Sequence, residues 1–424
     1  MLETVLHIFK TKDLRKKIFF VLGMLVVFRL AAIIPVPGVD LERLKTFFEG
    51  NQFFGLLNIF SGGALNNLSI VMLGVGPYIT ALIIMQLLTM VFPRLKELYQ
   101  GEGEQGRQKF NQYIRIITIP LAALQGYGLL ALLQSQNVID RLGIFSLITN
   151  LSVIIAGTMF LMWIGELISE KKIGNGVSLI IFAGIIAGIP TALKQFFFNY
   201  DPSMIPMLVV FLIVTVIVIG GVVFINDSQR NIPVSYAKRV RGSKMYGGVS
   251  TYLPLKVNQA GVIPIIFAIS ILLFPQMIGN FMQMSANDTM RNIGISLASF
   301  FQAGGFMYGA LYFLLVVIFT YFYTAVTFDT KQIAENVQKQ GGFIPGIRPG
   351  NSTAEFLHRV MNRITLAGAL SLGLIAILPF IIQYFTGMTT LTIGGTALLI
   401  VVSVALDTMK QIKAQLVMHE YERF

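Results

Sequence analysis

The chain contains repeated windows of about 20 mostly apolar residues, and this feature limits its possible folds more than any other. A helical window of this length spans a hydrocarbon core of roughly 30 Å. Charged residues make up only 12% of the chain, whereas soluble domains carry about 25%. A surface with so few charges cannot face water throughout. The sequence therefore predicts an all-α polytopic membrane protein.

Hydropathy places ten transmembrane helices along the chain. An even number of spans puts both termini on the same side of the membrane. The first span is full length, carries Arg29 and ends in "PVPGVD", so it is not expected to be a removable signal peptide. The predicted spans are residues 18–37, 75–92, 114–133, 147–168, 176–193, 205–225, 258–280, 303–327, 364–385 and 391–407.

The distribution of lysine and arginine predicts the orientation of these spans. Of the 32 cations, 26 fall at the termini and in the loops on their side, five fall on the other side, and Arg29 lies within the membrane. Cytoplasmic loops of membrane proteins carry the excess of positive charge. Both termini are therefore predicted to be cytoplasmic.

Two long cytoplasmic loops, residues 226–257 and 328–363, carry more positive charge than orientation requires. The first contains "YAKRVRGSKMY" and the second contains "GGFIPGIRPGN", a turn braced by glycine and proline around Arg348. Such loops can dock an acidic or phosphate-bearing partner. They can equally be solvated loops that face lipid headgroups. Composition leaves both interpretations open.

A short segment around residues 60–73 precedes the second span and is enclosed by glycines, as "SGGALNNLSIVMLGVGP" shows. About a dozen helical residues reach only about 18 Å, which is too short to cross the membrane. The ends of such a segment need protein or water to satisfy their backbone groups. We therefore expect a re-entrant element that lines a cavity. It is either a static wedge or an element that moves on its glycine hinges.

Residues that would carry enzymatic chemistry are missing from the sequence. The chain has no cysteine, no phosphate-binding G-x-x-x-x-G-K-[ST] motif and no cluster of His, Asp and Glu at metal-ligand spacing. We therefore predict no enzyme, no cofactor and no metal site, and a membrane-embedded hydrolase has nothing to support it. An ion-coupled secondary transporter with broken helices stays open as an alternative. It is disfavoured because the spans lack paired carboxylates, which coupled transport usually requires.

The spans also contain uncharged polar residues and a weak internal repeat. Thr80, Gln86, Gln125 and Asn258 either bond neighbouring helices or form a polar seam between separable ones. "GVGP" opens the second span and "GVIP" opens the seventh. Matching breaks in two halves indicate a repeat with a functional path at its interface.

Six motifs together resemble the SecY family, the channel subunit of the bacterial protein-translocating complex, in order from about Leu14 to Tyr421. They are "FRLAAIIPVPGVD", "NIFSGGALNNLSIVMLGVGPYITALIIMQLLT", "GTMFLMWIGELISEKKIGNGVSLIIFAGIIAGIP", "STYLPLKVNQAGVIPIIFA", "GGFIPGIRPG" and "IGGTALLIVV". The resemblance implies a passive, gated channel for unfolded secretory polypeptides. It also implies two pseudo-symmetric halves, which we expect at residues 1–200 and 201–424.

The resemblance further assigns roles to residues of the pore. It implies an apolar ring that neither selects side chains nor favours a continuous water column. It implies a movable plug on the external side of this ring. The ring residues are Val75, Ile79, Val177, Ile181, Ile266 and Ile400, and the plug residues are Phe60, Ser61, Gly62, Gly63, Ala64, Leu65, Asn66, Asn67, Leu68, Ser69 and Ile70.

A lateral gate and a set of partners follow from the same resemblance. The gate lies between the second and third spans and the seventh and eighth, and hydrophobic segments leave through it into lipid. Its candidate residues are Thr80, Gln86, Gln125, Asn258 and Phe274. The basic loops would dock the motor ATPase SecA or the ribosome through Lys238, Arg239, Arg241, Lys244 and Arg348. The implied membrane partners are SecE and SecG, the clients are unfolded secretory polypeptides and signal sequences, and ATP belongs to the motor.

Overall fold

The computed structural model is mostly helical, and every predicted span coincides with a helix. It describes residues 11–36, 58, 61–135, 138–140, 142–198, 205–236, 239–241, 244–246, 250–283, 285, 287–302, 305–386 and 389–421. The helices before residue 200 are α2 (Lys12–Ala31), α5 (Gly76–Val91), α6 (Pro93–Gln100), α7 (Gly103–Ser135), α8 (Ile144–Glu170) and α9 (Gly176–Phe198). Those after it are α10 (Ile205–Asp227), α11 (Ile263–Met282), α12 (Asp288–Phe300), α13 (Phe306–Thr327), α14 (Thr330–Lys339), α15 (Asn351–Thr386) and α16 (Thr389–Tyr421).

Several of these helices can span a membrane by length and composition. Within the described residues, α7, α8, α11, α13 and α15 are long and apolar enough to cross a membrane singly. A sixth span results if α5 and α6, which meet at a bend of 113°, are taken together. The bend lies at Pro93, whose ring favours a new helix start over continuation of α5. The apolar parts of α9 and α10 that the structure describes are shorter.

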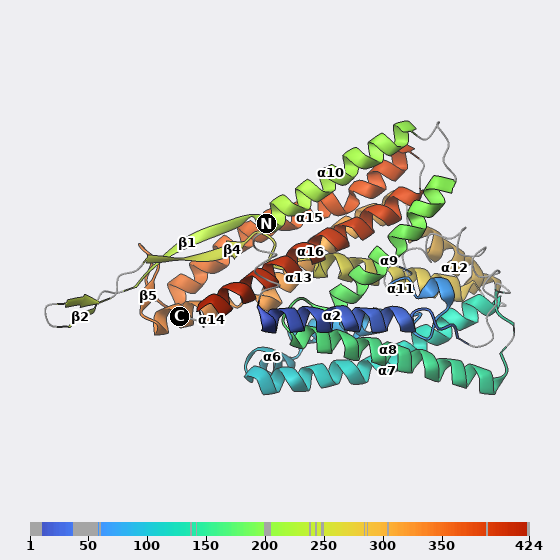
Figure 1. Ribbon diagram of the computed structural model, residues 1–424, viewed down its shortest axis with the longest axis horizontal. Helices are drawn as coiled ribbons and strands as arrows, with labels where there is room; N and C mark the ends of the chain where they lie inside the picture. Colours follow the sequence, from blue (N-terminus) through green and yellow to red (C-terminus); the bar gives the residue numbers. More distant parts are fainter. Residues whose placement is uncertain are drawn as a thin grey trace.

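The helices pack as two neighbouring groups (Figure 1). In the first group α7 packs on α5 and α8, and α8 packs on α2 and α9. In the second group α13 packs on α11 and α15, while α16 packs on α10 and α15. The groups meet where α11 contacts α5 and α7, and where α16 contacts α9. These two seams flank the site described below.

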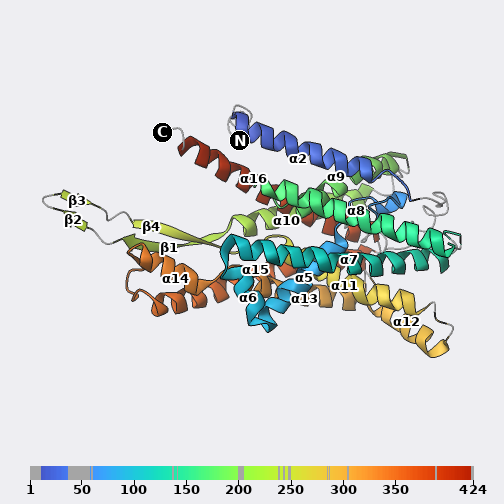
Figure 2. The ribbon, with the colours of Figure 1, turned by 90° about the horizontal axis from the view of Figure 1, so that it is seen from below.

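A β-hairpin extends from one end of the molecule, which we call the hairpin end (Figure 2). Its strands β1 (Gln229–Tyr236) and β4 (Ser250–Lys256) are antiparallel, and β5 (Gly342–Phe343) adds to β1. Two short strands, β2 (Arg239–Arg241) and β3 (Lys244–Tyr246), pair nearer the tip. The start of α2 lies near the end of α16, since Leu14 and Leu416 are buried in one cluster.

The two long basic loops form one packed unit. Ile232 and Leu255 of the hairpin share a separate hydrophobic cluster with Ala334 of α14 and Leu357 of α15. In the sequence the two loops are separate segments, and their first residues lie about 100 positions apart. The β1–β5 pairing joins them because β5 belongs to the second loop.

The segment before α5 is short and does not span, as predicted, but its backbone is not a regular helix. Its one helical element is a three-residue 3₁₀ turn, Leu65–Asn67, which ends at Leu68 in the left-handed region with a φ of 41°. Gly62, Gly63 and Gly74 also adopt positive φ. Because so many residues have φ values outside the helical range, the segment folds into tight turns.

Candidate functional site

Six aliphatic side chains come from the four helices that form the two seams between the helix groups, α5, α11, α9 and α16. Val75 and Ile79 come from the start of α5, and Ile266 comes from α11 across the first seam. Val177 and Ile181 come from α9, and Ile400 comes from α16 across the second seam. Five of them are buried, Val177 packs half-buried against them, and all belong to one hydrophobic cluster. All six residues predicted for the ring therefore belong to one extended cluster, and Ile79, Val177 and Ile266 line a common cavity.

A polar cavity of about 480 Å³ lies on one side of these residues. Ile79, Val177 and Ile266 contribute to its lining. Its other walls are largely polar and come from α7, α8 and the start of α9: Glu104, Gln108, Asn111, Gln112, Arg115, Glu166, Ser169, Glu170, Asn175 and Ser178. Apolar side chains of the central cluster therefore border a polar space lined by charged side chains.

An ion pair shapes the wall of this cavity. Arg115 Nε donates to Glu166 Oε1 at 2.9 Å, and its Nη2 lies 2.7 Å from Glu166 Oε2. This two-point geometry fixes both side chains more firmly than a single contact would. The pair joins α7 to α8 on the cavity side. A linear pattern of residues does not show this pair, because its partners lie on different helices, 51 residues apart in the sequence.

The segment of residues 61–75 packs against the central cluster and fills the space between the helices. Ala64 and Val71 are fully buried in the same cluster as the six aliphatic residues. Leu65, Leu68 and Met72 turn the other way, into a second cluster with α7 and α8. The segment is thus bound on two sides by apolar contacts.

At two positions the backbone of this segment contacts the backbone of a helix directly, with no side chain between them. A Cβ at Gly157 of α8 would lie 2.0 Å from the Ile70 carbonyl oxygen. A Cβ at Gly184 of α9 would lie 2.0 Å from Gly62 Cα. Only glycine permits such close approaches. Sequence reasoning missed both, and the signal that could have indicated them is glycine within otherwise apolar spans.

Hydrogen bonds tie the segment to the end of α2. The Ile70 amide donates to the Ile34 carbonyl at 2.9 Å, and the Val36 amide donates to the Leu68 carbonyl at 2.8 Å. Arg29 Nη1 donates to the Gly62 carbonyl at 2.9 Å. The intramembrane arginine noted in the sequence therefore binds the segment directly.

The predicted plug residues mostly lie in this segment. Ser61, Ala64, Leu65, Leu68 and Ser69 are buried. The Ser69 hydroxyl has no hydrogen-bond partner among the described residues. Phe60 lies outside the described residues.

A small pocket of about 70 Å³ opens along the first seam. Its lining includes Thr80 of α5, Gln125 of α7 and Phe274 of α11, three of the five residues predicted for the gate. The rest is mainly apolar, with Leu73, Leu129, Leu132, Leu273 and Met277. The Thr80 hydroxyl donates to the Gly76 carbonyl in its own helix at 3.0 Å. The Thr80 hydroxyl therefore donates its hydrogen within α5 and not across the seam.

The other two predicted gate residues lie elsewhere. Gln86 is buried toward the other end of α5, and its Oε1 has no partner among the described residues. Asn258 lines a different cavity, of about 290 Å³, together with Lys256, Asp407 and Lys410. Asn258 is expected at the start of the seventh span, but α11 begins only at Ile263, so Asn258 lies in the turn before it and away from the pocket that Thr80 lines.

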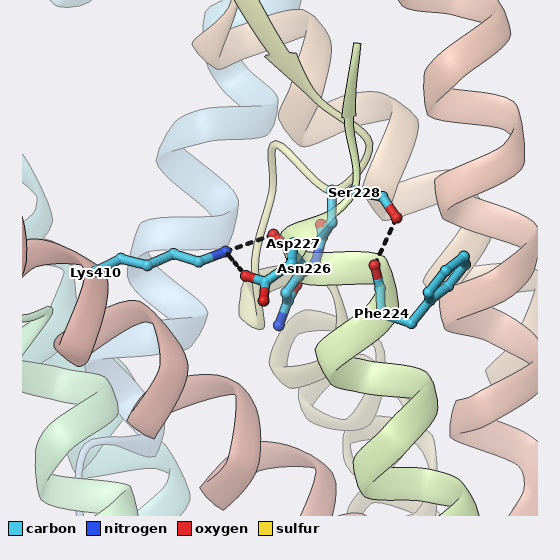
Figure 3. A network of polar contacts seen from close by, with 6 residues as sticks. Phe224, Asn226, Asp227, Ser228 and Lys410 are labelled. Carbon is cyan, nitrogen blue, oxygen red and sulfur yellow. Dashed lines mark hydrogen bonds and ion pairs between the residues drawn. The ribbon is translucent and has the colours of Figure 1, made fainter. Parts of the chain in front are cut away.

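Asn258 takes part in a polar network at the base of the hairpin, and Figure 3 shows its partner Asn226 with Asp227 and Lys410. Its Nδ2 donates to Asn226 Oδ1 at 2.8 Å, and its Oδ1 accepts from the Gly261 amide at 2.9 Å. Lys410 Nζ points from α16 toward the same place, where it bonds the Asn226 carbonyl and lies 2.9 Å from Asp227 Oδ1. The network joins the end of α10, the turn before α11, and α16.

The residues predicted for docking lie on the hairpin unit. Arg239 and Arg241 are on β2, and Lys244 is on β3. Arg348 lies in the turn before α15, where its carbonyl accepts from Thr353 Oγ1 at 2.9 Å. Lys238 lies outside the described residues. No group of three or more His, Asp or Glu able to hold a metal occurs in the described part of the chain.

Comparison with known sequences identifies one family. A family model described as SecY matches residues 69–409. The chain is 44% identical over 445 residues to Protein translocase subunit SecY of Streptomyces coelicolor, with 100% of both chains covered. It is also 44% identical over 437 residues to Protein translocase subunit SecY of Thermotoga maritima, with 100% of this chain and 98% of the relative covered.

Solved structures resemble the fold. One is described as showing that the plug domain of the SecY protein stabilises the closed state of the translocation channel and maintains a membrane seal; it matches with a TM-score of 0.66 and 20% identity. Another is Sec61 in the canine ribosome-channel complex from the endoplasmic reticulum, with a TM-score of 0.63 and 18% identity. Each match covers 94% of this chain and 91% of the other. At these identities the likeness concerns the fold.

Proposed function

Because the chain belongs to the SecY family, we propose that it is the protein-conducting subunit of a translocase. It gives unfolded secretory polypeptides a passive, gated path across the cytoplasmic membrane, and it releases hydrophobic segments sideways into lipid. Family membership supports this function and lends nothing to the alternative of an ion-coupled transporter. The role is that of a channel rather than an enzyme.

The observation that carries the proposal is that six aliphatic residues from the helices of both seams lie in one hydrophobic cluster, and that three of them, Ile79, Val177 and Ile266, line the same cavity. Val75, Ile79, Val177, Ile181, Ile266 and Ile400 share one cluster, with a polar cavity on one side and the 61–75 segment packed against it. These residues form the constriction of the pore. A ring of methyl groups has no hydrogen-bonding preference, so any side chain can pass. The same ring disfavours a continuous water column and so resists ion leakage.

Residues 61–70 of the 61–75 segment act as the plug. The contacts of the segment with α2, α8 and α9 are backbone hydrogen bonds and close glycine approaches, together with buried apolar side chains. These contacts close the pore as long as the helix groups stay together. Opening requires the segment to leave a site that buries it from two sides, so displacement needs a driving substrate.

The first seam between the helix groups acts as the lateral gate. Thr80, Gln125 and Phe274 line its pocket with leucines and Met277. A passing segment leaves through this seam when its transfer to lipid is more favourable than its stay in the aqueous pore. Gln86 contributes a buried amide farther along α5. Asn258 acts at the base of the hairpin rather than in this seam.

The hairpin end faces the cytoplasm and receives the partner that drives translocation. Both termini and most of the lysine and arginine residues belong to this side by the positive-inside rule. The hairpin and the Arg348 turn form one packed unit, so a single partner can contact both. SecA or the ribosome docks there, and SecE and SecG complete the membrane complex. Ribosomal RNA phosphates would make docking strongly salt-dependent.

A cross-linking experiment tests the path. One cysteine replaces Ile181 in this cysteine-free chain, and a second is placed midway along a stalled secretory substrate. A disulfide that forms only with motor and ATP supports passage through the ring. A matched variant carries the cysteine at Phe274 instead. A disulfide at Phe274 but none at Ile181 would mean that the substrate runs along the lateral seam and not through the ring.

A further inference from the structure

Helix α12 lies at the end of the molecule opposite the hairpin (Figure 2). It follows α11, whose 20 residues correspond to about 30 Å of rise, one hydrocarbon thickness. The 13 residues of α12 are too few to cross the membrane again. Helix α12 therefore begins at the depth where α11 reaches the membrane surface.

The surface of α12 is divided lengthwise into two flanks. Met290, Ile293 and Phe300 lie on one flank and are 47–51% exposed. The opposite flank carries Asn292 and Ser299, which are also exposed, together with the exposed Ile295. One flank of large apolar side chains and one mainly polar flank are typical of a helix that lies in the plane of a membrane interface.

Helix α12 is fastened to α11 by direct backbone contact. A Cβ at Gly279 of α11 would lie 2.8 Å from the Ala298 amide nitrogen, and one at Gly294 would lie 2.7 Å from the Gln283 amide nitrogen. Gln283 Nε2 also donates to the Gly294 carbonyl at 3.4 Å. The position of α12 therefore fixes the outer end of α11.

The neighbouring surface of α11 indicates what covers the apolar flank. Ile278 and Phe281, three residues apart on α11, are 45% and 46% exposed near the same end. Because α11 is a membrane-spanning helix, these side chains contact lipid. The flank formed by Met290, Ile293 and Phe300 extends this apolar surface onto α12.

We propose that α12 is an interfacial helix that inserts its Met290–Ile293–Phe300 flank into the lipid of the external leaflet. The occupant of the flank is a phospholipid at the level between headgroup and acyl chain. Through the glycine contacts, this insertion anchors the outer end of α11 to the membrane surface. The lipid contact goes beyond the proposed function and does not depend on transport activity.

Two isoleucines on α12 provide a matched test. Ile293 and Ile295 are 51% and 49% exposed, yet they point about 200° apart around the helix. Each is replaced by cysteine in the full-length, cysteine-free chain and labelled with an environment-sensitive fluorophore. The proteins are reconstituted into vesicles of phosphatidylcholine and phosphatidylglycerol. Quenching is measured with aqueous iodide and, separately, with a phosphatidylcholine that carries a nitroxide near its headgroup.

The label at position 293 should be quenched at least about threefold more by the lipid nitroxide than the label at 295, with the reverse order for iodide. Equal iodide quenching at both positions would place α12 in water and overturn the proposal. Shielding of position 293 from both quenchers would mean that protein covers the flank, which would also overturn it. If the Ile293→Cys variant does not fold, Phe300→Cys and Ser299→Cys give the same comparison on the two flanks.

Discussion

The backbone of Ile70 lies so close to Gly157 that a Cβ on Gly157 would approach the Ile70 carbonyl oxygen to 2.0 Å. No side chain separates the folded-back segment from α8 at this point. A single methyl group is therefore enough to push the segment away, and this makes its role in closing the pore accessible to experiment.

Gly157→Ala should displace the 61–75 segment and raise the resting ion conductance of the channel. The added methyl cannot be accommodated because the contacting atom is backbone. Conductance of the purified complex in planar bilayers without substrate measures the effect. Gly23→Ala is the control, since a Cβ at Gly23 meets no atom within 4 Å. Unchanged conductance in a folded Gly157→Ala protein would contradict the sealing role.

Arg29→Met should loosen the same segment by removing the donor to the Gly62 carbonyl. A hydrogen bond from a charged group contributes about 1.5–3 kcal/mol, so exposure of the segment should increase about tenfold or more. Ser69→Cys supplies the reporter, because Ser69 is fully buried and its hydroxyl has no partner among the described residues. The rate of thiol labelling from the external side is the measurement. Equal labelling rates with and without the Arg29→Met substitution would show that the bond does not hold the segment.

Ile181→Ser should make the pore conduct ions once the plug is displaced. Ile181 is fully buried among the ring residues, and a hydroxyl there supplies the hydrogen bonding that a water column needs. Conductance is compared in a Gly157→Ala background, where the plug no longer masks the ring. Ile181→Val, which keeps the site apolar, is the matched control. If serine and valine conduct equally, the chemistry of the ring does not control ion leakage.

Asn258→Ala should destabilise the start of α11. The change leaves the Gly261 amide and Asn226 Oδ1 without their partner, at a cost of about 1–3 kcal/mol in the free energy of unfolding. Asn258→Asp keeps the acceptor for Gly261 and should fall between alanine and the parent chain. Unfolding midpoints of the three proteins in detergent give the order. If the alanine and aspartate variants were as stable as the parent, the Asn258 hydrogen bonds would not stabilise the start of α11.

Arg348→Ala should weaken docking and leave the fold intact. The Arg348 side chain has no ion-pair partner among the described residues, and a surface substitution of this kind usually changes the free energy of unfolding by less than about 0.5 kcal/mol. Binding of SecA and of ribosomes to the reconstituted channel is measured at several salt concentrations. Lys339→Ala, which removes an equally charged residue that pairs with Glu335 at 3.7 Å, is the control. Equal loss in both variants would indicate a nonspecific charge effect.

The sequence determined the membrane class and the places of the ten longest apolar windows, although α6, α12 and α14 were not predicted. A membrane span is recognised from a run of apolar residues, and such a run depends only on residues that are neighbours in the sequence. All ten predicted spans coincide with helices. The family motifs also placed the six ring residues, which the structure gathers into one cluster. Residues far apart in sequence, such as Ile79 and Ile400, could be assigned together only through that resemblance.

Tertiary structure alone decided how the segments are held together. The tight turns around Leu65–Asn67 replace the expected short helix because packing against α7 and α8 and bonds to residues 34–36 outweigh local helix preference. Asn258 lies with Asn226 and Lys410 rather than with Thr80, because the turn before α11 returns to the end of α10. Such contacts depend on distances between remote residues, and linear patterns of hydropathy and charge carry no information about them.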